Sequence, residues 1–196
     1  MSFSKTNIFN LALLNLGVSN LVQNSIQDSP EALIMTGFYE VARDTVLEDH
    51  DWSFANAYQK VSTAEKESLD PNLPFVFTYP SDCIAPRAII DPNDNKEKKV
   101  FQAIDSQGQK IILAEIDTGI LRYTKRVDNE SYFTAPFVTA LSYYLAYMAA
   151  QAVVGSGNKK NTNLQDYQLA MRKAIVTDAR KNIPNDQDDS IYTDCR

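Results

Sequence analysis

The sequence contains little cysteine and little histidine, and this limits the chemistry that it can support. Cys83 and Cys195 are the two cysteines in 196 residues, and His50 is the single histidine. Two cysteines do not make a disulfide framework in a chain of this length, so we expect a reducing compartment. A Ser-His-Asp or Cys-His mechanism would have to use His50, which stands between Asp49 and Asp51 where a helix is predicted to end. We interpret His50 as a capping or surface residue, because a helix C-terminus favours a cation.

The common catalytic and cofactor motifs are also missing. The sequence has no Gly-x-Ser-x-Gly, no glycine-rich phosphate loop, no C-x-x-C pair and no H-E-x-x-H. Residues 91–95 resemble the start of a calcium loop, but Lys96 replaces the turn glycine and Gln102 the bidentate glutamate. Nothing selects a glycosidase pair among the 25 acidic residues. We therefore predict no catalytic residue, no cofactor, no metal site and no enzymatic activity.

The charge balance argues against tight binding to nucleic acid. The formal net charge is −6, with a sequence pI of about 4.8, whereas phosphate contacts need clustered Lys and Arg. Two short basic clusters occur, and we interpret both as charged, solvated strand edges. They consist of Lys96, Lys98 and Lys99, and of Arg122, Lys125 and Arg126.

Charged side chains are absent from residues 131–158, the longest apolar run in the chain. Pro136 near its start and Gly155 at its end predict a helix over residues 134–155. A membrane span fits the length, but tyrosines and other polar residues are spread along the whole segment, so we predict no membrane contact. Burial inside a large core or between subunits fits better, and the second option points to an oligomer. The expected packing residues recur at helical spacing: Phe137, Leu141, Leu145, Met148 and Ala152.

The rest of the chain predicts an α+β fold, mainly α, with a small antiparallel β lobe inserted between two helical pairs. We expect the other helices over residues 5–16, 29–49 and 163–182, and the β-rich insertion over about 54–127. Ser4 and Asp28 are the predicted N-caps of the first two helices. Trp52 and Phe54 are predicted to fix the end of the second helix to the core. Residues 1–183 are thus expected to form one domain; the first ten lack the basic start and apolar core of a signal peptide.

The last thirteen residues, 184–196, are expected to be disordered in the free protein. This acidic tail contains four Asp and one Arg, with Ile191 and Tyr192 as its apolar pair. We predict that the pair, flanked by Asp188 and Asp189, is a short anchor for a partner.

Several landmarks recur in an order that is typical of one protein family. Residues 12–32 resemble an N-x-x-L-x-x-L-G helix with its loop, and a helix ending in W-x-F follows at Trp52 to Phe54. Next come a Y-P-x-D-C strand start and the approach to a long inner helix: Tyr79 to Cys83, Tyr123 to Val127, Tyr132-Phe133, Pro136-Phe137 and Ala140-Leu141. Together these resemble the head-to-tail connectors, or adaptors, of short-tailed bacteriophages, the family that includes tail tubular protein A.

The resemblance implies a structural virion protein that is assembled in the host cytoplasm. Members form a homo-oligomeric ring, twelve-fold in this family, that docks beneath the portal protein and continues the DNA channel to the tail nozzle protein. DNA would pass through the lumen without specific binding, the C-terminal segment would reach the portal, and tail fibres are a further candidate partner. The alternatives are a virion-associated peptidoglycan hydrolase and a head-completion or neck protein of a long-tailed phage.

Overall fold

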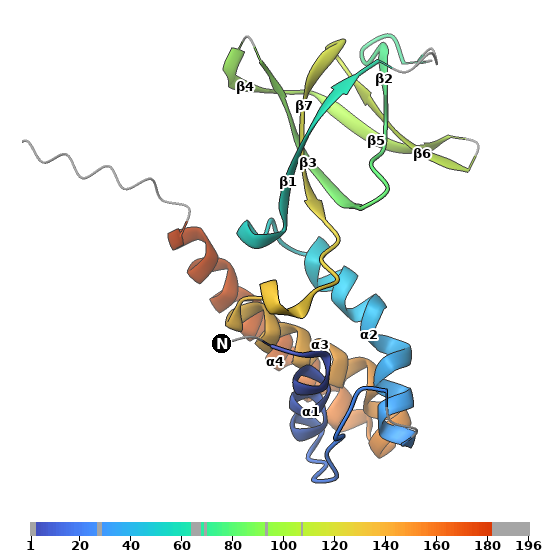
Figure 1. Cartoon of the computed structure of the whole chain (residues 1–196), viewed down its shortest axis with the longest axis vertical. Coiled ribbons are helices and arrows are strands. Elements are labelled where there is room, and N and C mark those ends of the chain that lie inside the picture. Colours follow the sequence, from blue (N-terminus) through green and yellow to red (C-terminus); the bar gives the residue numbers. More distant parts are fainter. Residues whose placement is uncertain are drawn as a thin grey trace, which may run out of the picture.

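The protein is α+β, mainly α, with a bundle of helices below a lobe of two small antiparallel sheets (Figure 1). The computed structural model describes residues 3–26, 29–63, 68, 70–92, 94–106 and 108–181. Its α-helices are α1 (Lys5–Leu16), α2 (Pro30–Glu48), α3 (Ala135–Val154) and α4 (Gly157–Lys181). The strands are β1 (Asn56–Ser62), β2 (Phe75–Thr78), β3 (Cys83–Asp91), β4 (Asp94–Lys99), β5 (Phe101–Ser106), β6 (Gln109–Ala114) and β7 (Thr118–Lys125), with short 3-10 turns η1 (Ser53–Ala55) and η2 (Glu130–Tyr132).

The charge-free helix α3 is the centre of the bundle, and α1, α2 and α4 pack around it. Phe137, Leu141 and Leu145 are fully buried in the largest hydrophobic core, as predicted. Met148 is half-buried and packs against the same core. Ala152 is exposed, so its prediction as a packing residue is wrong within the subunit: it lies in the last turn, on the side that no neighbouring helix covers.

Helix α3 is long enough and apolar enough to cross a membrane: it has 20 residues, and the mean hydropathy of an 18-residue stretch within it is 1.4. Three helices of the same chain account for this composition, because they remove much of α3 from water. The packing partner that the sequence required for α3 is therefore already present within the subunit.

Capping residues set the helix starts. Ser4 caps α1, as predicted, and Gly17 ends the helix at φ 81°. The cap of α2 is Ser29, whose Oγ accepts from the Ala32 amide at 3.2 Å. The predicted cap, Asp28, lies outside the described residues.

Helix α4 begins six residues earlier than the sequence indicated. The helix was expected from residue 163, but the polar residues 157–162 form its first turns. Gly155 adopts φ 60° and Ser156 follows as the cap, with its Oγ accepting from the Lys159 amide, so two residues suffice to join α3 to α4. The polar composition reflects the solvent-exposed face of α4 rather than a loop.

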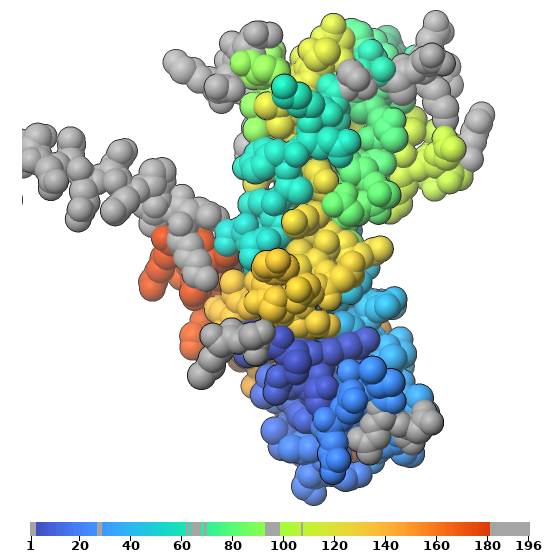
Figure 2. Space-filling model, in the orientation of Figure 1, coloured from blue at the N-terminus to red at the C-terminus, as the bar shows by residue number. Residues whose placement is uncertain are grey.

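The β lobe has two sheets, with strand orders β1-β7-β3-β4 and β2-β6-β5. A hairpin joins β5 to β6, and Gly108 adopts φ 78° there. Phe77, Ile89, Ile112 and Leu121 come from both sheets and share a small core. The lobe sits directly on the bundle, and the segment that follows β7 lies between them (Figure 2).

The burial pattern of α3 yields a paired test. Leu145→Asp places an unpaired carboxylate in the core and is expected to lower the free energy of unfolding by about 3–5 kcal/mol. Ala152→Asp adds the same charge to the same helix at an exposed position and should change it by no more than about 0.5 kcal/mol. Urea denaturation followed by circular dichroism measures both. Equal effects of the two variants would show that α3 is not packed as described.

Candidate functional site

Charged side chains connect the helical bundle to the β lobe at one place, which we call the junction. Its groups come from α2 and the turn after it, from β3, and from the end of β7 and the segment that follows. The junction residues are Arg43, Asp44, Asp51, Arg87, Arg122, Arg126 and Asp128.

Arg87 makes the most contacts across the junction. Its Nη2 donates to the main-chain oxygens of Leu47 at 3.3 Å, Glu48 at 2.8 Å and His50 at 2.9 Å, and its Nε donates to Thr124 Oγ1 at 2.8 Å. The last carbonyls of a helix have no partner within the helix, so a guanidinium satisfies them and complements the negative end of the dipole. Arg87 therefore fixes the end of α2 to β3 and β7.

A strand irregularity places Arg87 in this position. The pairing of β3 with β7 shifts between Pro86 and Ala88, so that Arg87 has no partner in the register. Proline cannot donate to the sheet ladder, and a bulge of this kind redirects a side chain. The local sequence Pro86-Arg87 thus releases the arginine from the sheet and lets it reach α2.

Arg43 and Arg126 share carboxylates beside this contact. Arg43 is buried and pairs with Asp44 at 2.9 Å and Asp128 at 2.8 Å. The other oxygen of Asp44 accepts from Arg126 at 2.8 and 3.0 Å. These paired charges join α2 to the segment that leaves the lobe toward α3.

One of the predicted basic clusters belongs to the junction. Arg122 pairs with Asp51 and Arg126 with Asp44, so acids neutralise two of its three charges. Its interpretation as a strand edge is wrong, because β7 lies between β1 and β3. The other cluster, at Lys96–Lys99, is on the edge strand β4.

His50 and Ser53 meet Asp178 of α4 at the end of the junction. Ser53 Oγ donates to Asp178 Oδ1 at 2.6 Å, and the Ser53 amide donates to Oδ2 at 3.0 Å. His50 Nε2 lies 3.3 Å from Asp178 Oδ2, but without the alignment of a hydrogen bond. The carboxylate thus stands between serine and histidine, whereas nucleophile activation needs the histidine in the middle. The group fixes α4 to η1 and does not form a catalytic triad.

Buried tyrosines add hydrogen bonds from neutral hydroxyls to carboxylates around the junction. Burial, followed by the nearby Glu130 carboxylate, raises the pKa of Tyr39 far above its ordinary value, and its hydroxyl donates to Glu130 at 3.0 Å. Burial and Asp82 likewise raise the pKa of Tyr123 to about 12. Both phenols stay protonated at neutral pH and act as donors, which suits a structural role.

Trp52 anchors the turn between α2 and β1. It is fully buried, its Nε1 donates to the Val46 carbonyl at 2.8 Å, and its ring packs edge-on against Phe137 of α3. Phe54 is half-buried and contacts both rings. These contacts confirm that Trp52 and Phe54 fix the end of α2 to the core.

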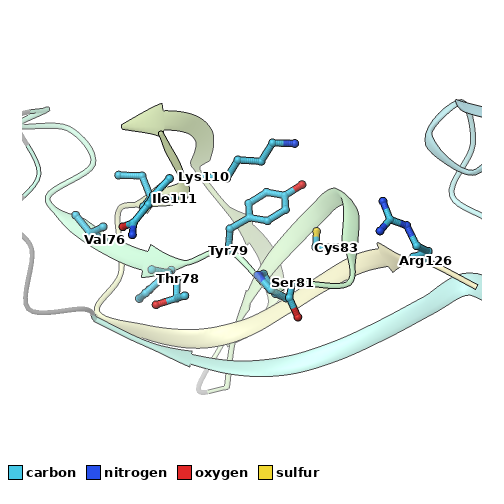
Figure 3. A pocket seen from close by; sticks show the side chains of 11 residues that line it. Val76, Thr78, Tyr79, Ser81, Cys83, Lys110, Ile111 and Arg126 are labelled. Carbon is cyan, nitrogen blue, oxygen red and sulfur yellow. The ribbon is translucent and has the colours of Figure 1, made fainter. Parts of the chain in front are cut away.

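A pocket of about 770 Å³ lies in the lobe and is lined by β2, β6 and the turn into β3 (Figure 3). Tyr79 and Cys83 lie inside it. The Tyr79 hydroxyl donates to the Ile84 carbonyl at 3.2 Å, and Lys110 Nζ lies 5.5 Å from its ring centre. Burial raises the pKa of the Cys83 thiol, which keeps it protonated and therefore a poor nucleophile.

Sequence reasoning found the core anchors but not the junction. Pairs such as Arg87 with the α2 carbonyls join residues about 40 positions apart, and no local pattern selects them. Pro86 inside a strand was the available signal, because it predicts a bulge. Among the described residues no group of three or more His, Cys, Asp and Glu could hold a metal ion. The predicted portal contacts, Asp188, Asp189, Ile191 and Tyr192, lie outside the described residues.

Comparison with known proteins identifies no relative of this chain. Models of known protein families give no match to the chain. Curated protein sequences give none either.

Substitution of Arg87 tests the junction. Arg87→Met keeps the aliphatic stem but leaves the α2 carbonyls and Thr124 without their donor, so we expect a loss of about 2–3 kcal/mol in the free energy of unfolding. Lys60→Met, at an exposed position on β1, removes one positive charge without touching the junction and serves as the control. Urea denaturation decides, and a loss for Arg87→Met no larger than for the control would contradict the assigned role.

The Cys83 thiol offers a second test, on a Cys195→Ser background that leaves one cysteine. Because its pKa is raised, the thiolate fraction at pH 8 is low, and alkylation by iodoacetamide should be at least about tenfold slower in the folded protein than in urea. The folded rate should keep rising at pH values where the unfolded rate has levelled off. A folded rate equal to the unfolded rate would show an accessible thiol of ordinary pKa instead.

Proposed function

We propose that this protein is a structural virion subunit, a ring-forming connector that docks beneath the portal of a phage head and continues the DNA channel toward the tail nozzle. Twelve copies are the expected ring size, and the part that we assign to the chain is mechanical rather than catalytic.

The observation that best supports the proposal is the role of the residues that carry the family resemblance. Val22, in the first of these stretches, is bound by Asn10 of α1, whose side-chain amide donates to the Val22 carbonyl at 2.9 Å and accepts from the Val22 amide at 2.8 Å, which holds the first loop on α1. Gly17 ends α1, and Trp52 joins α2 to α3. Asp82 accepts from the Tyr123 hydroxyl and the Arg126 amide. Landmarks far apart in the sequence thus build one framework, so the resemblance concerns the scaffold as a whole.

The junction is consistent with a connector. A subunit that joins two bodies has to transmit position from one part to the other, and Arg87 with the paired charges holds the lobe to the bundle at several points. Neutralised arginines and a net charge of −6 also suit a channel wall past which DNA moves without adhesion.

A hydrolase gains no support from the described residues. Ser53 donates to Asp178 instead of to His50, and Cys83 is held protonated.

The acidic tail provides the test of docking. Removal of residues 184–196 should change the melting temperature by less than about 2 °C, since four Asp and few apolar side chains cannot sustain a core. The truncated chain should, however, bind poorly to portal-containing heads in a co-sedimentation assay. Ile191→Ala with Tyr192→Ala should reproduce the defect, and Ser190→Ala with Thr193→Ala is the matched control. Full binding by the truncated chain would contradict tail docking, and failure to fold would place the tail in the core.

A further inference from the structure

Helix α2 presents an apolar stripe to solvent that none of the described residues covers. Leu33 is 59% exposed and Val41 is 57% exposed, although both belong to a helix whose opposite face is fully packed. They lie eight residues apart, and Gly37 stands midway between them. Positions spaced by four share one helix face, so the three residues form a single stripe.

Gly37 has no function within the subunit that the structure reveals. A Cβ added there would meet nothing within 4 Å. Glycine in the interior of a helix costs about 1 kcal/mol relative to alanine. A small residue flanked by two exposed large ones leaves a shallow notch, and such a notch allows the side chains of another helix to approach closely.

Helix α4 carries a second stripe of the same kind. Leu169 is 61% exposed and Val176 is 53% exposed, seven residues apart on the face that points away from α3. At a rise of about 1.5 Å per residue, the apolar pairs of α2 and α4 span about 12 and about 10.5 Å, so they match in length.

The charges that surround the two stripes are opposite. Glu40 and Glu48 are exposed beside the α2 stripe, whereas Arg172, Lys173 and Arg180 are exposed beside the α4 stripe. These five side chains have no ion pair with any described residue, in contrast to the paired acids and arginines of the junction.

The two stripes cannot cover each other within one subunit. Both helices pack against α3, and they have no extensive contact with one another. The C-terminal half of α4 and the body of α2 lie on opposite sides of the bundle (Figures 1 and 2). When a subunit carries two different, complementary surfaces on opposite sides, one surface binds the other surface of the next copy. Such head-to-tail contacts close into a ring when the rotation from one subunit to the next permits it.

We propose that the outer face of α2, defined by Leu33, Gly37, Glu40, Val41 and Glu48, binds the outer face of α4 in a second copy of this chain. The α4 face is defined by Leu169, Arg172, Lys173, Val176 and Arg180. This inference assigns the surfaces that join neighbouring subunits. The closure of these contacts into a ring rests on the proposed connector function. Contact between like faces of two copies is disfavoured, because it brings Glu to Glu or Arg to Arg.

Charge reversal on each face tests the contact. One variant carries Glu40→Lys and Glu48→Lys, and a second carries Arg172→Glu and Lys173→Glu. Each alone sets like charges against each other and should raise the concentration of half-assembly at least about tenfold, measured by sedimentation velocity. A chain with all four substitutions restores opposite charges and should assemble within about threefold of the unaltered protein. Mixing the two reversed variants should also restore assembly, because each supplies the face that the other lacks.

Two controls separate this contact from other effects. Lys60→Glu reverses an exposed charge on β1 in the β lobe and should leave assembly unchanged. Gly37→Gln fills the notch; it should keep or raise the melting temperature and still weaken assembly. Rings that form equally well from both reversed variants would overturn the α2–α4 contact and leave the connector function intact. An unaltered chain that stays monomeric at all accessible concentrations would overturn both.

Discussion

The absence of charge along α3 is the constraint on which the rest of the structure depends. Helix α3 lies within a stretch, residues 131–158, that has no charged side chain, so the helix has to be shielded from water. This protein shields it with three helices of its own chain. Two of the three, α1 and α2, precede the β lobe in the sequence, and α4 follows α3 directly. The chain must therefore leave the bundle, build the lobe and return, which places all the lobe connections at one end of the bundle.

The junction restricts movement between the β lobe and the helical bundle, which this chain path would otherwise allow. Two connections, after α2 and after β7, link the lobe to the bundle, and each is a point at which the two parts could turn relative to one another. Arg87 ties the first connection to the sheet, and the Arg43-Asp44-Arg126 pairs tie the second to α2. Asp178 adds α4 to the same region through Ser53. Partly buried charges with several partners lose more when one partner is removed than exposed pairs do, so the junction holds the two parts in a defined relation.

Local signals made most of the fold predictable, and the failures have physical causes. Ser4 and Gly17 bound α1 because capping is a property of neighbouring residues. The start of α4 was missed because a solvated helix face and a polar linker have the same composition, and the difference lies in Ser156 as a cap. Ala152 follows the helical period of Leu141 and Leu145, but the period does not tell where the covering helices end. Arg87 and Arg122 looked like ordinary strand charges, since their partners are distant in sequence and are set by tertiary structure alone.

The structure also changes the reason to expect an oligomer. The sequence suggested it through α3, but three helices of the same chain cover much of α3, and exposed apolar residues lie on the outer faces of α2 and α4, as well as on α1 and in loops. Cryo-electron microscopy of the phage particle to which the proposal assigns this chain, classified around the vertex that carries the tail, tests the central claim most directly. The account predicts a closed ring of this chain beneath the portal, with α2 of each subunit against α4 of the next and the β lobes on one side of the ring. Density for this chain elsewhere in the particle, or as isolated copies without mutual contact, would contradict it.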